Sequence, residues 1–330
     1  EVSLVGRPSG GFSAVTLVCE ATISGGAEAG TRRIVLRKET PEPAVYPQQS
    51  SETLLEIDIQ QRVMRAIHDH TDLPVAEIIG FEPDPSVIGA PFFVMSYIDG
   101  LVPIESPPYT TEGFFLDAAP ADRGRLIGNG IRTLARFHAQ PLEALDLGWL
   151  SSTTTPGSRH LVDLWRRFGE DELRGRSHPD LERAWRWIDA NLPDDRDLVL
   201  CWGDARPGNI IWRDFEPVCL TDFEAACVGP RDFDLAWWLM FDRTMHESVG
   251  VARPEGDPTR DEQRALYFEA AGIAPRDTTA HEVFAAARYS VIVVRVMNRL
   301  EQRGMLPPDS LVWRDNPASA CLADLLAELT

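Results

Sequence analysis

Three short apolar segments, within a half of the chain that otherwise has helical periodicity, most constrain what this sequence can fold into. They span residues 198–201, 210–212 and 218–220. Runs this short and this apolar are typical of buried strands. The loop after the first segment holds Asp204 and Asn209, and Asp222 follows the third segment. We therefore expect three short strands joined by tight loops that carry two carboxylates and one amide.

The rest of the chain divides into two parts of different character. Residues 1–98 contain strand patterns near 2–5, 13–20, 33–37, 75–81 and 92–98, with one helical pattern around Leu55, Ile59 and Val63. A Pro-rich connector occupies residues 99–108, and residues 109–330 are mostly of helical pattern. This order predicts an α+β fold, with a small β N-lobe and a larger helical C-lobe. Nucleotides often bind between two such lobes.

Composition narrows the classes of partner. The chain has 330 residues and a net charge of −19, which argues against binding to nucleic acid or to an anionic membrane surface. No apolar run reaches the roughly 18 residues of a membrane helix, and the first residues lack a secretory pattern. The five cysteines form no Cys-x-x-Cys pair and predict buried, reduced thiols. We expect a cytoplasmic protein, monomeric or weakly homodimeric.

The polar residues of the 198–223 region match the needs of phosphoryl transfer from a nucleotide. That reaction uses a carboxylate to accept the proton of the substrate hydroxyl, an oxygen ligand for magnesium, and a second carboxylate on the metal. Asp204, Asn209 and Asp222 fit these roles in that order. Asp, Gly and Asn are also common in ordinary turns. The strand–loop–strand setting and the β-rich N-lobe favour the phosphotransferase interpretation.

Three motifs carry a resemblance to a known family. They are Trp202-Gly203-Asp204 through Asn209, Asp222-Phe223-Glu224, and Gly229-Pro230 through Asp234-Leu235-Ala236. On these motifs the chain resembles the aminoglycoside phosphotransferase and choline kinase-like family of the protein-kinase-like fold, in the branch with a Trp-Gly-Asp-Ala-Arg loop. Trp202 stands where that family usually has His, and we interpret this position as scaffold.

The resemblance implies ATP and magnesium as cofactors and assigns roles in the C-lobe. Asp204 would be the catalytic base, and Asn209 and Asp222 the magnesium ligands. Arg206 would touch the transferred phosphate, although it could instead only pair with carboxylates. Asp234 would hold the backbone of the catalytic loop.

The resemblance also assigns a cation to the N-lobe. Arg37 would bind the α- and β-phosphates, and we favour it over Lys38 because adjacent strand residues point to opposite faces. The helix that usually supplies a Glu partner has Gln60 in the best register, with Glu56 one turn earlier. Gln60 would orient the Arg37 guanidinium by a neutral hydrogen bond.

Two further segments complete the expected nucleotide site. A turn containing Gly10, Gly11 and Ser13 would cover the phosphates, since Gly lets backbone amides approach an anion. Ser96 and Ile98 would offer backbone hydrogen bonds to adenine at the hinge between the lobes.

The sequence therefore predicts an ATP-dependent phosphotransferase that acts on a hydroxyl of a small molecule. The alternative is a nucleotide-binding scaffold with little or no turnover. The family resemblance leaves several acceptors open, among them aminoglycosides, choline, homoserine, sugars and hydroxyacyl thioesters. The acceptor should lie near residues 284–300, a segment with Tyr289, Arg295, Asn298 and Arg299. Such a segment does not suit a polycation, so we disfavour an aminoglycoside.

Overall fold

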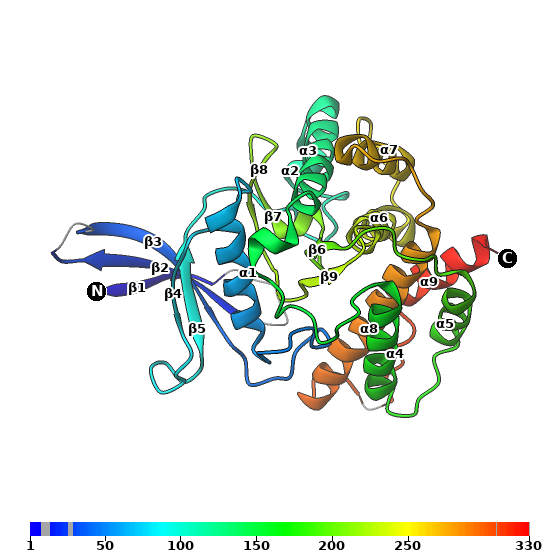
Figure 1. The fold of residues 1–330 in the computed structure, drawn as a ribbon, viewed down its shortest axis with the longest axis horizontal. Helices are drawn as coiled ribbons and strands as arrows, with labels where there is room; N and C mark the ends of the chain where they lie inside the picture. The colour runs from blue at the N-terminus through cyan, green and yellow to red at the C-terminus, as the bar shows by residue number, and fades with distance from the viewer. Residues whose placement is uncertain (8–13, 26–28, 308, 330) are drawn as a thin grey trace.

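A five-stranded antiparallel sheet forms the N-lobe. The computed structural model describes residues 1–7, 14–25, 29–307 and 309–329. The sheet order is β1-β2-β3-β5-β4. Its strands are β1 (Val2–Gly6), β2 (Val15–Ile23), β3 (Gly30–Lys38), β4 (Ile78–Glu82) and β5 (Phe92–Ser96). One helix, α1 (Glu56–His70), packs on β4 and β5 and lies between the sheet and the C-lobe (Figure 1). The predicted order of strands and helix in this lobe is confirmed.

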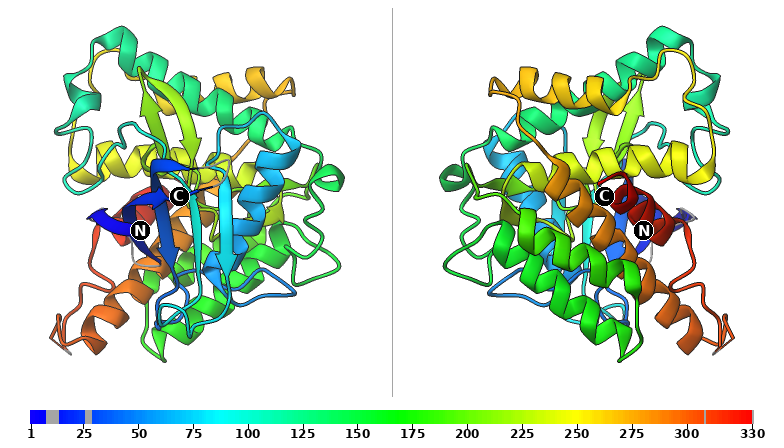
Figure 2. Two further views of the ribbon diagram at one scale, coloured as in Figure 1. Left: turned by 90° about the vertical axis from the view of Figure 1, so that its left-hand side faces the viewer. Right: turned by 90° about the vertical axis from the view of Figure 1, so that its right-hand side faces the viewer.

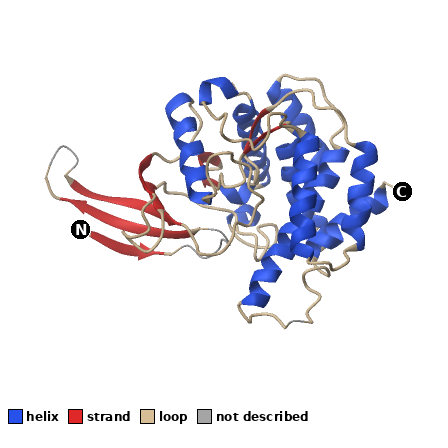
Figure 3. Cartoon of the chain, turned by 60° about the horizontal axis from the view of Figure 1, so that its bottom comes forward, coloured by secondary structure: helices blue, strands red, loops and turns tan. Residues whose placement is uncertain are grey.

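Helices dominate the C-lobe, as Figure 3 shows in blue. Two short helices are α2 (Phe114–Asp117) and the 3₁₀ turn η1 (Leu142–Leu145). The longer ones are α3 (Pro120–His138), α4 (Ser158–Leu173), α5 (Pro179–Asn191), α6 (Asp232–His246), α7 (Arg260–Ala271), α8 (Thr279–Gln302) and α9 (Pro317–Glu328). Two 3₁₀ turns, η2 (Pro207–Asn209) and η3 (Glu247–Val249), complete the set. The two lobes together confirm the α+β protein-kinase-like fold.

The short strands of the C-lobe form two small antiparallel pairs. One pair is β6 (Val199–Cys201) with β9 (Cys227–Gly229), and the other is β7 (Ile210–Arg213) with β8 (Glu216–Leu220). The sequence predicts β6, β7 and β8 but not β9, which ends in Gly229 next to Pro230, a pair typical of turns. Both pairs lie at the centre of the molecule in Figure 1, beneath α3 and beside α6. They frame the loop that carries Asp204.

Helix α6 is the buried centre of the C-lobe. All of its residues except Arg243 are buried, so it lacks the polar face of a surface helix. It contacts α7, α8 and α9, and the side views in Figure 2 show helices on both sides of it. At Gly130 of α3, a Cβ would lie 2.5 Å from the Trp238 ring, so this close approach requires glycine. In the described part of the chain no helix is long and apolar enough to cross a membrane. All five cysteines are buried and free.

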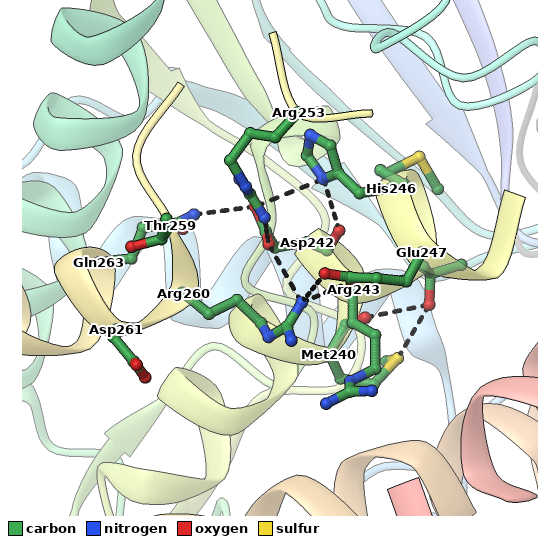
Figure 4. A network of polar contacts seen from close by, with 12 residues as sticks. Met240, Asp242, Arg243, His246, Glu247, Arg253, Thr259, Arg260, Asp261 and Gln263 are labelled. Carbon is green, nitrogen blue, oxygen red and sulfur yellow. Dashed lines mark hydrogen bonds and ion pairs between the residues drawn. The ribbon is translucent and has the colours of Figure 1, made fainter. Parts of the chain in front are cut away.

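A buried polar network closes the C-terminal end of α6 (Figure 4). His246 Nε2 forms a hydrogen bond with Asp257 at 2.8 Å. Arg253 forms ion pairs with Asp242 at 2.5 Å and with Asp257 at 3.3 Å. Gln263 of α7 donates to Asp242 at 2.8 Å. One nitrogen of His246 and one carboxylate oxygen from each of Asp242 and Asp257 all lie within 4.8 Å of one another. Because Arg253 already supplies the positive charge among them, we interpret this network as a structural clasp between α6 and α7.

The clasp predicts a pH dependence of stability. Burial lowers the pKa of His246, but the hydrogen bond that its imidazole donates to Asp257 and the charge of Asp242 outweigh this effect, and the pKa is raised from its ordinary value of 6.5. The stabilisation is therefore complete below the unfolded pKa and is lost as pH rises through the folded pKa. Between about pH 6 and about pH 8.5, thermal unfolding should show a larger loss of stability for the wild type than for His246→Gln. Parallel curves for the two proteins would contradict this.

Candidate active site

The loop between β6 and β7 is fixed to the C-lobe by α6. Asp234 accepts hydrogen bonds from the backbone N–H groups of Trp202 at 2.6 Å and Gly203 at 2.8 Å. This confirms the predicted role of Asp234. Gly203 has φ +86°, and a Cβ there would lie 2.0 Å from the Ala225 carbonyl oxygen, so only glycine fits. Trp202 stacks on Phe223 with ring centroids 5.5 Å apart, which agrees with a scaffold role.

Asp204 projects from this loop as a carboxylate with four donors. Its Oδ1 accepts from Arg206 Nε at 2.9 Å and from the Trp237 indole at 2.7 Å. Its Oδ2 accepts from the Asn209 amide at 2.8 Å and from the Tyr46 hydroxyl at 3.1 Å. Only 3% of Asp204 is exposed. The two oxygens thus have different surroundings, and Tyr46 reaches one of them from the segment between β3 and α1.

These contacts keep the carboxylate charged. Burial raises the pKa of Asp204, but the Arg206 charge and the hydrogen bonds to Asp204 outweigh it, and the pKa lies below its ordinary value. Burial also raises the pKa of the Tyr46 hydroxyl well above 10, and the charge of Asp204 adds to this. At neutral pH the site therefore presents an ionised carboxylate next to a protonated hydroxyl.

Asn209 and Asp222 are brought together by the backbone. The Asn209 NH₂ group donates to both the carbonyl and the carboxylate of Asp204, so its amide oxygen faces the other way. The Thr221 N–H donates to the Asn209 carbonyl at 2.9 Å, which places Asp222 beside it. Asp222 has φ +58°, a conformation unusual for a residue with a side chain. Such backbone strain concentrates at functional sites.

In the N-lobe, Arg37 of β3 faces Asp222. Arg37, 7% exposed, forms an ion pair with Asp222 through Nη1, and its Nη2 lies 3.9 Å from Glu224. The predicted hydrogen bond between Gln60 and Arg37 is wrong. The Gln60 NH₂ donates instead to Glu224 at 2.9 Å, and its amide oxygen has no hydrogen-bond partner among the described residues. The Gln60 NH₂ and the Arg37 guanidinium are both donors and need an acceptor, and Glu224 lies near both of them.

Three other predicted contacts have different outcomes. Gly10, Gly11 and Ser13 lie outside the described residues. The Ser96 N–H donates to the Glu77 carbonyl at 2.9 Å, and the predicted contact of the Ser96 backbone with adenine stays a prediction. Ile98 follows β5 directly before the connector, and its contact with adenine also stays a prediction.

Arg206 joins the catalytic loop to the connector. It forms ion pairs with Asp204, at 2.9 Å, and with Glu105. Its guanidinium carbon lies 4.9 Å from the centre of the Phe241 ring, which also packs against Tyr289 with centroids 5.1 Å apart. The side chains beside Asp204 and Arg206 are therefore aromatic. The carboxylates of Asp204 and Glu105 are both paired with Arg206.

Helix α8 holds the segment that carries Tyr46. Arg295 donates to the Ala44 carbonyl at 2.9 Å, and Arg299 donates to the Pro43 carbonyl. Arg303 pairs with Glu42 at 2.5 Å. Arg295, Arg299 and Arg303 of α8 therefore bind the protein's own backbone and side chains. This leaves these three side chains less available to a phosphate-accepting substrate.

Tyr46, Trp237 and Arg288 are site residues that the sequence analysis did not identify. Arg288 is fully buried, donates to the Gly203 carbonyl at 2.8 Å and lies 3.6 Å from the centre of the Phe233 ring. A Trp within an apolar helical pattern, such as Trp237, is typical of an ordinary core residue. An Arg within the apolar face of a long helix is a signal that could have identified Arg288, because a buried cation needs a partner. Tyr46 offers no such signal.

The chain belongs to the phosphotransferase enzyme family, whose sequence model matches residues 22–283. Among curated proteins it is similar to human acyl-CoA dehydrogenase family member 11, at 26% identity over 257 residues. That match covers 74% of this chain and 30% of the human protein. The chain thus spans less than a third of the length of this relative.

Solved structures share the fold. A Ralstonia eutropha protein designated an aminoglycoside phosphotransferase superposes with a TM-score of 0.72 at 19% identity, covering 99% of this chain and 93% of that one. Plasmodium vivax ethanolamine kinase gives a TM-score of 0.60 at 12% identity, covering 99% and 81%. Aminoglycoside phosphotransferase APH(4)-Ia, in a ternary complex with AMP-PNP and hygromycin B, gives 0.59 at 12% identity, covering 98% and 94%. These likenesses establish a kinase-like small-molecule phosphotransferase fold.

Proposed function

We propose that this protein transfers the γ-phosphate of ATP to a hydroxyl of a small molecule, with Asp204 as the base. The observation that carries the proposal is the hydroxyl of Tyr46 on Asp204 Oδ2, at 3.1 Å. It marks a position from which an acceptor hydroxyl could pass its proton to the carboxylate. The low pKa of Asp204 keeps that oxygen able to accept a hydrogen bond.

Asn209 and Asp222 would hold magnesium. Oxygen ligands from carboxylates and amides are those that this cation prefers, and the donor set of Asp222, Glu224 and Asn209 fits it. The bound metal would neutralise charge on the phosphates. Arg37 would then turn from Asp222 to the α- and β-phosphates, and Arg206 would face the transferred group. The ternary complex of APH(4)-Ia with AMP-PNP supports ATP as the donor.

We favour a hydroxyacyl thioester as the acceptor over an aminoglycoside. The wall beside Asp204 is formed by Phe241 and Tyr289, which suits an apolar chain. A polycation would need carboxylates free of other cations, whereas Glu105 and Asp204 both pair with Arg206. The human relative is named for acyl-CoA dehydrogenases, which is consistent with a thioester acceptor.

An acceptor panel tests this function. ADP release from magnesium-ATP should be measured with hydroxyacyl thioesters, ethanolamine, choline, sugars and aminoglycosides. We expect a hydroxyacyl thioester to stimulate ADP release at least about tenfold more than any aminoglycoside does, which corresponds to a difference of about 1.4 kcal/mol. Greater stimulation by an aminoglycoside would overturn the acceptor assignment while leaving the phosphotransferase assignment intact.

The scaffold alternative predicts a different result. A protein that binds magnesium-ATP but shows neither acceptor-dependent transfer nor slow hydrolysis in single-turnover experiments would be a nucleotide-binding scaffold. Isothermal titration with ATP, with and without magnesium, separates this outcome from failure to bind nucleotide at all.

A further inference from the structure

We propose that Trp237 is a positioning residue that fixes the rotation of the Asp204 carboxylate, an inference that rests on the proposed function. The indole Nε1–H donates to Oδ1 at 2.7 Å. Trp237 is 1% exposed and lies on α6, the buried helix that also anchors the catalytic loop through Asp234. One rigid element therefore sets both the position of the loop and the direction of its carboxylate.

The two oxygens of the Asp204 carboxylate have different hydrogen-bond partners. Trp237 and Arg206 both donate to Oδ1, whereas Oδ2 faces the Tyr46 hydroxyl. Arg206 has a second partner in Glu105 and is 19% exposed in its side chain, so it can move with substrate. The indole cannot, because it packs against Phe241, with centroids 5.2 Å apart, and beneath the Arg288 guanidinium at 4.3 Å. Trp237 is thus the fixed donor to Oδ1. Together with Asn209, which donates to Oδ2 at 2.8 Å, it keeps Oδ2 turned toward the acceptor.

The neighbouring residue provides a matched control. Trp238 is also 1% exposed, lies on the same helix, and donates its indole N–H to Gln263 at 2.8 Å. Replacing either Trp with Phe removes one indole N–H and leaves an aromatic ring in the core. Only Trp237→Phe should affect the base, since Trp238 contacts no residue of the catalytic loop through its N–H.

Kinetics test the proposal without a known acceptor. Magnesium-ATP hydrolysis by water, followed as phosphate release, should fall about 10- to 100-fold in kcat for Trp237→Phe, the range for a hydrogen bond to a charged group. KM for magnesium-ATP should stay within about twofold, and Trp238→Phe should match the wild type in both constants. In an Asp204→Asn background, adding Trp237→Phe should change the residual rate little, because its effect passes through Asp204. An equal loss in both backgrounds would overturn the proposal.

A spectroscopic measurement decides the contact even if Trp237→Phe does not fold or the wild type shows no turnover. In ¹⁵N-labelled protein, the Trp237 indole signal can be assigned from its proximity to the Phe241 ring. Asp204→Asn should shift that signal, because its acceptor loses its charge, and should leave the Trp238 signal unchanged. A Trp237 signal that does not respond to Asp204→Asn would show that the indole does not hold this carboxylate. Absence of turnover with a responsive signal would count against the proposed function alone.

Discussion

Replacing Asp204 with Asn should lower phosphoryl transfer by about 10²-fold or more, the scale of a lost general base. Asn is nearly isosteric with Asp. Its amide oxygen can accept the hydrogen bonds that Trp237 and Arg206 donate to Oδ1 in the wild type. What is lost is the charge on the oxygen that faces the Tyr46 hydroxyl. Affinity for magnesium-ATP should stay within about threefold, because this carboxylate contacts the acceptor side of the site.

The control for Asp204→Asn is the same substitution at Asp117, which is exposed at the end of α2. Asp117→Asn should retain wild-type turnover and stability. Single-turnover transfer from radiolabelled ATP provides the measurement, and circular dichroism checks the fold. Near-wild-type transfer by Asp204→Asn would mean that another group accepts the proton.

Local patterns in the sequence were sufficient for most elements of the fold. The helical spacing of Leu55, Ile59 and Val63 predicts α1, which the structure places at Glu56–His70. The family resemblance, through the motif that contains Asp234, implies an anchor for the loop between β6 and β7, and the hydrogen bonds from the Trp202 and Gly203 N–H groups confirm it. Both predictions depend on residues close together in the chain or on a motif of fixed spacing.

The site residues that the sequence did not reveal depend on contacts between distant parts of the chain. Tyr46 contacts Asp204, 158 positions further along the chain, and it belongs to a segment without helix or strand. Trp237 lies in a helix whose residues are all buried except Arg243, so burial alone accounts for a large aromatic side chain there, and its polar N–H gives no separate signal. The sequence predicts that Gln60 meets Arg37, but Gln60 donates to Glu224, 164 positions further along the chain. A contact between residues so far apart has no local signature in the sequence.

Replacing Arg37 with Ala should weaken magnesium-ATP binding by about 1.5–3 kcal/mol, the range for hydrogen bonds to charged groups. In the structure this guanidinium is buried at the edge of the cleft, and its Nε has no partner among the described residues. Asp222 alone forms its close ion pair, with Glu224 at 3.9 Å. A polyphosphate in a chain of net charge −19 needs a cation opposite it, and the fork of an Arg can hold two phosphate oxygens.

Lys38 provides the matched control in the next position of β3. Adjacent strand residues point to opposite faces, and Lys38 is only partly buried, whereas Arg37 faces Asp222. Lys38→Ala should therefore change the affinity for magnesium-ATP by less than about 0.5 kcal/mol, as for most surface substitutions. Calorimetric titration of both variants makes the comparison, and thermal unfolding checks that loss of the Asp222 ion pair has not opened the N-lobe. If Lys38→Ala were the damaging change, the phosphates would lie on the other face of β3; if neither mattered, nucleotide would bind outside this cleft.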